Sequence, residues 1–169
     1  RQIISPFPDR LNTPIPSFVH SLVTLSSRAE AGYRGRRCYI LGKAGSYFKD
    51  KQVRSLLHAL AHFGFGMHTT CTGKGCWMPP HGKVVRHNKM QPIHFSRLLQ
   101  DMAFIVGLGD PKVSPTPLEG LAAGAAFLNP LLNRSNAADY GYSGGRMGVN
   151  AVKSQHAAIA MLGAPYVYN

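Results

Sequence analysis

The stretch AFIVGLGDPKVSPTPLEGLAAGAAFL, residues 103–128, decides the fold. It opens with a continuous apolar run over 103–108, which has the length and character of a strand buried on both faces. Gly107 and Gly109 end this run, and a glycine- and proline-containing loop leads directly into a predicted helix over 117–124. A second strand is predicted over 125–128. Strand, helix and strand in this order form the unit from which parallel sheets are built.

The rest of the chain repeats this alternation. Val53, Leu56, Leu57 and Leu60 fall at helical spacing and predict a helix that Gly64 stops. In chain order, the other predicted elements are a strand over 38–41, that helix over 50–62, a strand over 67–72, a long loop over 73–91, a helix over 92–102, and, past the sheet-forming stretch, a helix over 150–161 and a strand over 166–167. The sequence therefore predicts an α/β fold with a Rossmann-like parallel sheet, right-handed crossovers and ligands at the carboxyl ends of the strands.

The first 37 residues differ from the rest. They are predicted to be irregular because prolines interrupt them repeatedly, although the apolar stretch 18–25 is compatible with a strand. Four arginines then cluster over 28–37, and two interpretations stay open: a patch that binds phosphate or a polyanion, and a solvated linker between domains. We therefore divide the chain into an inter-domain segment, 1–37, and a Rossmann-like domain, 38–169.

Composition limits the class of protein. The chain has 169 residues, enough for one domain with a hydrophobic core, and 44% of them are apolar. Its net charge of +12 favours anionic partners, which include nucleic acid, an anionic membrane surface and a phosphate-bearing small molecule. No segment approaches the ~20 apolar residues that span a bilayer. The chain begins at Arg1, so we expect a part of a longer or processed product, with any membrane anchor outside it.

Three cysteines do not make a disulfide framework. Cys38 is predicted to be buried, whereas the sequence leaves open whether Cys71 and Cys76 pair. Both lie near three histidines, but the irregular spacing argues against a zinc module, and no metal site is predicted. The set considered was His68, Cys71, Cys76, His81 and His87. The triplet Asn133-Arg134-Ser135 is an N-glycosylation sequon and gives weak support for a secretory location.

Two loops at predicted strand ends carry the candidate site. Glu119, one of only two glutamates, follows the 103–108 strand and has two interpretations. It completes a capping box with Thr116, or it accepts hydrogen bonds from a ribose diol, and both roles are compatible. The helix start there suits an anion. Lys43, after Gly42, is either a phosphate ligand at a strand end or an exposed turn lysine.

Several familiar catalytic patterns are missing from the sequence. It shows no Ser-His-Asp arrangement and no Walker-type phosphate loop, and Gly107-x-Gly109 lacks the third glycine of the dinucleotide fingerprint. With only seven acidic residues, a paired acid/base mechanism within this chain is not expected.

These segments together resemble the C-terminal part of the N-acetylglucosaminyltransferase V family, the alpha-1,6-mannosylglycoprotein 6-beta-N-acetylglucosaminyltransferases. Order and spacing hold from about Cys38 to the C-terminus, and the combination over 107–130 is the specific part. The segments that match family motifs are Leu41-Gly42-Lys43, Ser46-Tyr47-Phe48-Lys49, Phe104-Ile105-Val106-Gly107-Leu108-Gly109, Pro115-Thr116-Pro117-Leu118-Glu119-Gly120-Leu121-Ala122, Ala126-Phe127-Leu128-Asn129-Pro130, Ser154-Gln155-His156 and Gly163-Ala164-Pro165-Tyr166-Val167.

The resemblance implies the C-terminal half of a GT-B glycosyltransferase, which binds UDP-N-acetylglucosamine, inverts the anomeric carbon and needs no metal or other cofactor. It implies a Golgi membrane setting on the lumenal side. By position, Glu119 matches the family glutamate at the uridine ribose, and Arg146 matches a basic residue near the donor phosphates. The full set of expected donor-binding residues is Gly42, Lys43, Gly107, Gly109, Ser114, Pro115, Thr116, Pro117, Leu118, Glu119 and Arg146.

The resemblance places the catalytic base in an N-terminal acceptor domain that is absent from this chain, so the chain alone is expected to bind donor, a UDP-sugar, and to transfer little. The N-glycan acceptor would be reached through that domain. Val113 stands where the family carries an acidic residue, and Ser114 replaces a glycine. These departures motivate an alternative, a sugar-nucleotide-binding module with weak or lost transferase activity. A polyanion-binding domain is a third reading, but the chain shows no nucleic-acid motif, and nucleic acid is not an expected partner.

Overall fold

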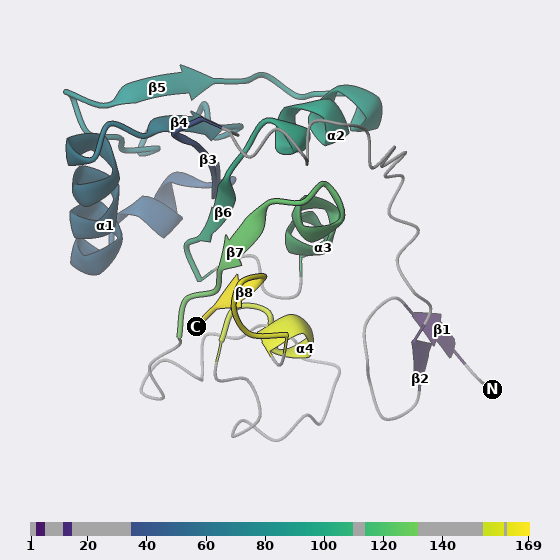
Figure 1. Ribbon diagram of the computed structural model, residues 1–169. Helices are drawn as coiled ribbons and strands as arrows, with labels where there is room; N and C mark the ends of the chain where they lie inside the picture. Colours follow the sequence, from purple (N-terminus) through teal and green to yellow (C-terminus); the bar gives the residue numbers. More distant parts are fainter. Residues whose placement is uncertain (1–2, 6–11, 15–34, 110–113, 132–153, 161) are drawn as a thin grey trace.

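The computed structural model describes residues 3–5, 12–14, 35–109, 114–131, 154–160 and 162–169 (Figure 1). Its main feature is a six-stranded sheet in the order β5-β4-β3-β6-β7-β8, and every neighbouring pair is parallel. The strands are β3 (Arg37–Leu41), β4 (Gly66–Thr69), β5 (Lys83–Arg86), β6 (Phe104–Gly107), β7 (Ala126–Leu128) and β8 (Val167–Tyr168). The predicted α/β class with a Rossmann-like parallel sheet is confirmed.

Helices cover both faces of this sheet (Figure 1). One face packs against the 3-10 turn η1 and helix α1, and the other packs against α2, α3 and α4. Their bounds are Gly45–Phe48 for η1, Lys51–His62 for α1, Pro92–Gln100 for α2, Pro115–Ala122 for α3 and Ala157–Ala160 for α4. The result is the layered arrangement of helix, sheet and helix that parallel strands require.

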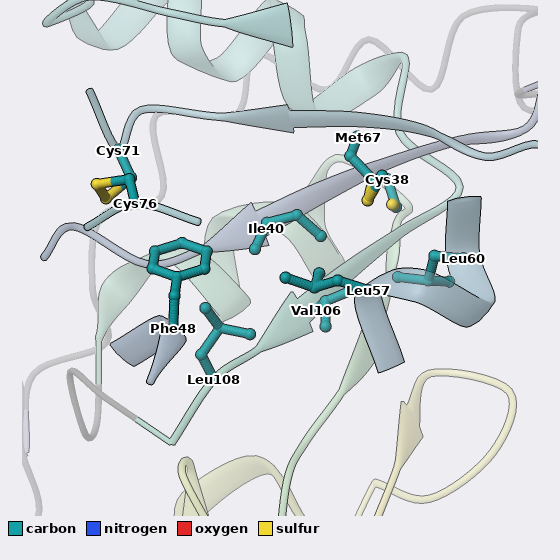
Figure 2. Packing of buried hydrophobic residues seen from close by; sticks show 10 residues of the cluster. All are labelled: Cys38, Ile40, Phe48, Leu57, Leu60, Met67, Cys71, Cys76, Val106 and Leu108. Atoms are coloured by element: carbon teal, nitrogen blue, oxygen red, sulfur yellow. A yellow bond between two sulfur atoms is a disulfide. The ribbon is translucent and has the colours of Figure 1, made fainter. Parts of the chain in front are cut away.

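Strand β3 shows why both faces need cover. Side chains alternate along a strand, so Cys38 and Ile40 enter one core while Tyr39 and Leu41 enter the other. All four are at most 2% exposed. Figure 2 shows the first core, in which Ile40 packs with residues of α1, β4 and β6. Burial of each large apolar side chain contributes about 1.5–3 kcal/mol, so the central strand anchors the fold.

Helix α1 forms where the sequence predicted it. The Asp50 side chain caps its first turn by accepting a hydrogen bond from the Gln52 amide at 2.6 Å. Leu57 and Leu60 are its buried residues, and Gly64 follows its end with a φ of 74°. The cap, the apolar spacing and the stop signal agree, which is why the prediction from sequence succeeded here.

Helix α3 corrects the predicted range 117–124. It begins at Pro115, two residues earlier, and its N-cap is Ser114, whose hydroxyl accepts a hydrogen bond from the Thr116 amide. The capping box that was predicted for Thr116 and Glu119 is therefore wrong. Thr116 lies inside the first turn and is only 6% exposed. Ser114 and Thr116 each precede a proline that suits a first helical position, and the helix begins after the earlier of the two.

Strand β5 corrects the predicted loop over 73–91. Residues Lys83–Arg86 pair with β4 as an edge strand. Their side chains are mostly exposed, so they carry no apolar alternation from which a strand can be predicted. The predicted helix over 150–161 is reduced to α4 among the described residues, and the last strand lies one residue later than predicted.

The amino-terminal segment is described in part. Strands β1 (Ile3–Ser5) and β2 (Asn12–Pro14) form a two-stranded parallel pair within a region that was predicted to be irregular. The strand considered over 18–25 lies outside the described residues, as do Arg28, Arg34 and the sequon at Asn133. The division of domains at residue 37 stays a prediction. In the part of the chain that the structure describes, no helix is both long and apolar enough to cross a membrane.

Candidate functional site

The strand order defines the candidate site. From β3 the chain adds β4 and β5 on one side of the sheet, then returns to place β6, β7 and β8 on the other side. The direction of winding reverses between β3 and β6, and ligands of open α/β sheets bind at such a switch point, beyond the carboxyl ends of the strands. The loops that leave this edge begin at Gly42 and at Leu108.

The β3 loop approaches the β6 loop closely at Gly42. A Cβ added to Gly42 would lie 2.9 Å from Leu108 Cδ1 and 3.0 Å from Phe48 Cζ, so a glycine fits where a larger residue would displace the core. The next residue, Lys43, is exposed at the carboxyl edge of the sheet. The sequence prediction that Gly42 and Lys43 mark a strand end is therefore confirmed as a placement.

Glu119 lies on α3 and faces the same edge. It is half-buried, and burial raises the pKa of its carboxyl group, while the Lys43 ammonium opposes this by lowering that pKa. The two side chains come from segments that are 76 positions apart in sequence, yet lie close enough to interact electrostatically. A carboxylate and an ammonium at a switch point can bind the two chemically different ends of a nucleotide, a diol and a phosphate.

Tyr39 and Thr70 add polar groups beside Glu119. The Tyr39 hydroxyl and Thr70 Oγ1 form a hydrogen bond of 2.9 Å that joins the middle of β3 to the residue after β4. Burial raises the Tyr39 pKa, hydrogen bonds to Thr70 oppose the rise, and the Glu119 carboxylate adds to it. This pair could not be predicted from the sequence, because Tyr39 has the pattern of an ordinary strand residue.

The predicted glycines Gly107 and Gly109 shape the β6 loop. Gly109 has a φ of 93°, a conformation that L side chains rarely adopt, and its amide donates a 2.9 Å hydrogen bond to Gln155 Oε1. A Cβ on Gly107 would clash with Gln155 Oε1 and would lie 2.5 Å from Pro130 Cδ. Gly107 is needed because a distant segment packs directly against its backbone, and Gly109 is needed because of its positive φ.

Residues 154–156 and Asn129 form a buried support below this loop. Asn129 Oδ1 accepts a 2.9 Å hydrogen bond from the His156 amide, and Asn129 Nδ2 donates to Asn169 Oδ1 at 2.8 Å. Burial lowers the pKa of the His156 imidazole, and backbone groups of His156 and Ser114 partly oppose this. Neither ring nitrogen of His156 has a hydrogen-bond partner among the described residues. Sequence reasoning did not place these residues in the site, since only their match to a family motif marked them.

The start of α3 offers fewer backbone donors than a helix N-terminus usually does. Pro115 and Pro117 occupy its first and third positions and have no N–H, and the Thr116 amide already donates to Ser114 Oγ at 3.4 Å. Thr116 and Pro117 are buried, and Leu118 packs against the core. An anion at this helix start would therefore rely more on cationic side chains than on backbone amides, and the expected anion site stays a prediction.

The structure thus brings Gly42, Lys43, Gly107, Gly109, Ser114 and Glu119 to one edge of the sheet. Arg146, the other predicted cation, lies outside the described residues, and so do 110–113, which include Val113. Their contributions to the site stay predictions.

Four of the five residues considered for zinc make other interactions. Cys71 and Cys76 form a disulfide, which answers the question that the sequence left open and removes both thiolates as ligands. His68 Nδ1 and His87 Nε2 form a 2.9 Å hydrogen bond. No cluster of three or more potential metal ligands occurs within the described ranges. Cys38 is the free cysteine and is buried, as predicted.

Comparisons with known proteins agree with this architecture. Residues 4–169 match the glycosyltransferase family 18 profile. Over 137 residues, the chain is 29% identical to alpha-1,6-mannosylglycoprotein 6-beta-N-acetylglucosaminyltransferase A of Rattus norvegicus and of Homo sapiens, and 28% identical to that of Cricetulus griseus. Each match covers 80% of this chain and 18% of the relative, so the chain spans about a fifth of the length of these proteins. The chain belongs to glycosyltransferase family 18.

Proposed function

We propose that this chain forms the donor-binding half of an inverting, metal-independent glycosyltransferase. In this proposal, the enzyme moves N-acetylglucosamine from UDP-N-acetylglucosamine to the 6-position of an alpha-mannose in N-linked glycans. The family and the names of the relatives support the class of reaction. The observation that carries the donor site is the approach of Lys43 to Glu119 at the topological switch point.

Each side chain has a defined task in this proposal. The Glu119 carboxylate accepts hydrogen bonds from the ribose diol of the donor. The Lys43 ammonium, with Arg146, neutralises the diphosphate, a task that a metal ion performs in other transferases. During transfer, the acceptor oxygen bonds to the anomeric carbon while the bond from that carbon to the diphosphate breaks. UDP leaves, and the hydroxyl proton passes to a base in an acceptor-binding half.

We also propose a cellular compartment for the reaction. We place the enzyme on the lumenal side of the Golgi membrane, held by an anchor outside this chain. The disulfide between Cys71 and Cys76 supports an oxidising compartment, because such bonds are rare where cytosolic thiol reductants act.

Calorimetric titration of the 169-residue chain with UDP and UDP-N-acetylglucosamine, with EDTA present, tests the donor site. We expect binding without metal, and we expect Glu119→Gln to weaken it about tenfold or more, because a charge-assisted hydrogen bond contributes about 1.5–3 kcal/mol. Asp101→Asn is the matched control. It removes one negative charge at the C-cap of α2, which precedes β6 and lies at the amino edge of the sheet, away from the carboxyl edge that carries the candidate site.

The outcomes separate the candidate functions. Tight UDP binding that Glu119→Gln weakens and Asp101→Asn leaves unchanged supports the donor site. Transfer is then measured with an N-glycan acceptor in a chain that also carries an acceptor-binding half, and binding without transfer would favour a module that has lost its activity. Binding that ignores the nucleoside and falls steeply with salt would instead indicate a polyanion-binding domain.

A further inference from the structure

The loop between β3 and α1 is held from two sides, and Lys43 lies between the two contacts. On the inner side, Gly42 packs against Leu108 and Phe48. On the outer side, a Cβ added to Gly45 would lie 2.7 Å from both the carbonyl oxygen of Lys74 and the carbonyl carbon of Gly75. The two backbones are therefore in direct contact at Gly45, and whatever fixes the outer contact also fixes the path of the chain on which Lys43 stands.

The outer contact is the tip of a covalently closed loop, residues 71–76, which we call the disulfide loop. A disulfide joins Cys71 and Cys76, and both residues are buried in the core cluster that contains Phe48 (Figure 2). Inside the loop, the Cys76 amide donates to the Gly73 carbonyl at 3.2 Å. Gly75 at the tip has a φ of 93°. The loop is thus a defined turn with a closed base, and its tip touches Gly45.

Arg86 holds the base of the disulfide loop from the edge strand β5. Its Nη1 donates to the Cys71 carbonyl and its Nη2 donates to the Cys76 carbonyl, each at 2.8 Å. Two hydrogen bonds from one planar guanidinium fix both the spacing and the orientation of these carbonyls, which the single ammonium of a lysine cannot do.

Arg54 on α1 connects the two loops a second time. Its Nε donates to the Phe48 carbonyl at the end of η1 at 2.9 Å, and its guanidinium lies 5.3 Å from the ring centre of Trp77, the residue after the disulfide loop. Arg54 therefore contacts both the end of the loop that carries Lys43 and the residue that follows the disulfide loop.

We propose that the disulfide loop is a positioning element for Lys43, so that the affinity of the chain for a nucleoside diphosphate depends on the bond between Cys71 and Cys76. This inference rests on the proposed function of Lys43 as a phosphate ligand. Ordering a loop when a ligand binds costs affinity, and a loop that is already held in place avoids that cost. Lys43 matters more here than at an ordinary helix start, because the two prolines at the start of α3 have no N–H to donate to the phosphate.

Two independent changes release the contact. The double variant Cys71→Ser, Cys76→Ser opens the disulfide loop, while Gly45→Ala keeps the disulfide and pushes the two backbones apart. Gly73→Ala is the matched control in the same loop, because a Cβ at Gly73 meets nothing within 4 Å. In calorimetric titrations with UDP, we expect each releasing change to weaken binding about tenfold, which is the loss that corresponds to one misplaced charge-assisted contact, and we expect Gly73→Ala to bind as the parent chain does.

Repeating these titrations in a Lys43→Ala background separates positioning from general damage. If the loop acts through Lys43, the releasing changes cost little further affinity once that side chain is gone. An equal loss in both backgrounds would overturn the proposal, and so would releasing changes that leave UDP affinity unchanged in the chain that keeps Lys43. Far-ultraviolet circular dichroism confirms that each variant is folded, and Gly45→Ala carries the test if the double serine variant fails to fold.

The result for the parent chain distinguishes this proposal from the proposed function. If the folded parent chain does not bind UDP, both are overturned. If the parent chain binds UDP and Glu119→Gln weakens binding, but opening the disulfide loop does not, the donor site stands and only the positioning role is rejected.

Discussion

Gln155 accepts a hydrogen bond from the amide of Gly109 at 2.9 Å, although 46 positions separate the two residues in sequence. Gln155 is fully buried, and its Oε1 also lies against the backbone at Gly107. The carboxyl-terminal part of the chain therefore supports the loop that opens the candidate donor site. Residues that never contact a ligand can still determine the conformation of this loop.

Replacing Gln155 tests that support. Gln155→Leu keeps much of the side-chain volume but leaves the Gly109 amide without its acceptor, so we expect the free energy of unfolding in urea to fall by about 1–3 kcal/mol. Gln91→Leu is a suitable control, since Gln91 is exposed and its side chain makes no capping hydrogen bond. Equal stability of the two variants would show that the hydrogen bond contributes nothing measurable.

Gly107 provides a second test of the same packing. In Gly107→Ala, the added methyl group meets Gln155, the Pro130 ring and the Leu128 carbonyl oxygen, which lies 3.1 Å away. Ring and backbone atoms cannot yield easily, so we expect unfolding to become about 1–3 kcal/mol easier. Gly66→Ala is the matched change in another strand, because its nearest foreign atom lies 3.6 Å away. Thermal unfolding of both variants measures the difference, and a loss of similar size in Gly66→Ala would contradict this explanation.

The sequence was sufficient to predict the centre of this fold. The β3 and β6 strands are short apolar runs that end in glycine, and α1 has apolar spacing, a cap and a stop. Parallel strands bring their carboxyl ends to one edge, so the sequence also predicts that the loops after β3 and β6 lie at the same edge of the sheet, as they do. These predictions succeeded because independent local signals agreed at each element.

The rest could not be predicted because the deciding interactions are non-local. Strand β5 is defined by its pairing with β4, since its exposed side chains carry no pattern. Ser114 and Thr116 are both suitable caps by local rules, and the structure shows that Ser114 is the one that caps α3. The two hydrogen bonds from Arg86 and the acceptor role of Gln155 join distant segments, and no spacing rule indicates them.

The Glu119 carboxylate should favour the binding of UDP but lower the stability of the fold at pH 7. Burial raises its pKa, so the folded chain binds a proton at this carboxyl more readily than the unfolded chain does. A raised pKa means that the contribution of Glu119 to stability is present below its ordinary value of 4.5 and is lost as the pH rises through the folded-state value. We therefore expect Glu119→Gln to unfold at higher urea concentration than the parent at pH 7, while it binds UDP more weakly.

Lys43 opposes the effect of burial on the pKa of Glu119, so a change at Lys43 tests the same argument. The Lys43 ammonium lowers the pKa of Glu119, so Lys43→Ala should raise that pKa further, as followed by the carboxyl carbon signal of Glu119 in an NMR titration. Lys51→Ala, which removes an exposed lysine at the start of α1, should leave it unchanged. A Glu119 pKa at or below 4.5 in the parent chain would contradict the burial argument.

The buried imidazole of His156 should make the fold less stable in acid. Its side chain is 2% exposed, and burial holds the pKa of the imidazole below the ordinary value of 6.5. The unfolded chain therefore binds a proton at pH values where the folded chain does not. The sign follows from linkage: the contribution of His156 to stability is complete above pH 6.5 and is lost as the pH falls from there through the folded-state pKa. Urea unfolding should show a lower midpoint at pH 5.5 than at pH 7.5.

A variant at His156 tests whether this imidazole causes the loss of stability in acid. His156→Gln removes the titration but keeps a polar side chain, so its midpoint should depend less on pH over the same interval. Burial also lowers the pKa of His68, with His87 and Arg37 contributing further, so His68→Gln should remove a separate part of the acid sensitivity. Because His68 lies on β4 and His156 lies in the turn before α4, their effects should add in the double variant. If His156→Gln loses stability between pH 7.5 and 5.5 as steeply as the parent does, protonation of that ring does not limit the acid stability of this fold.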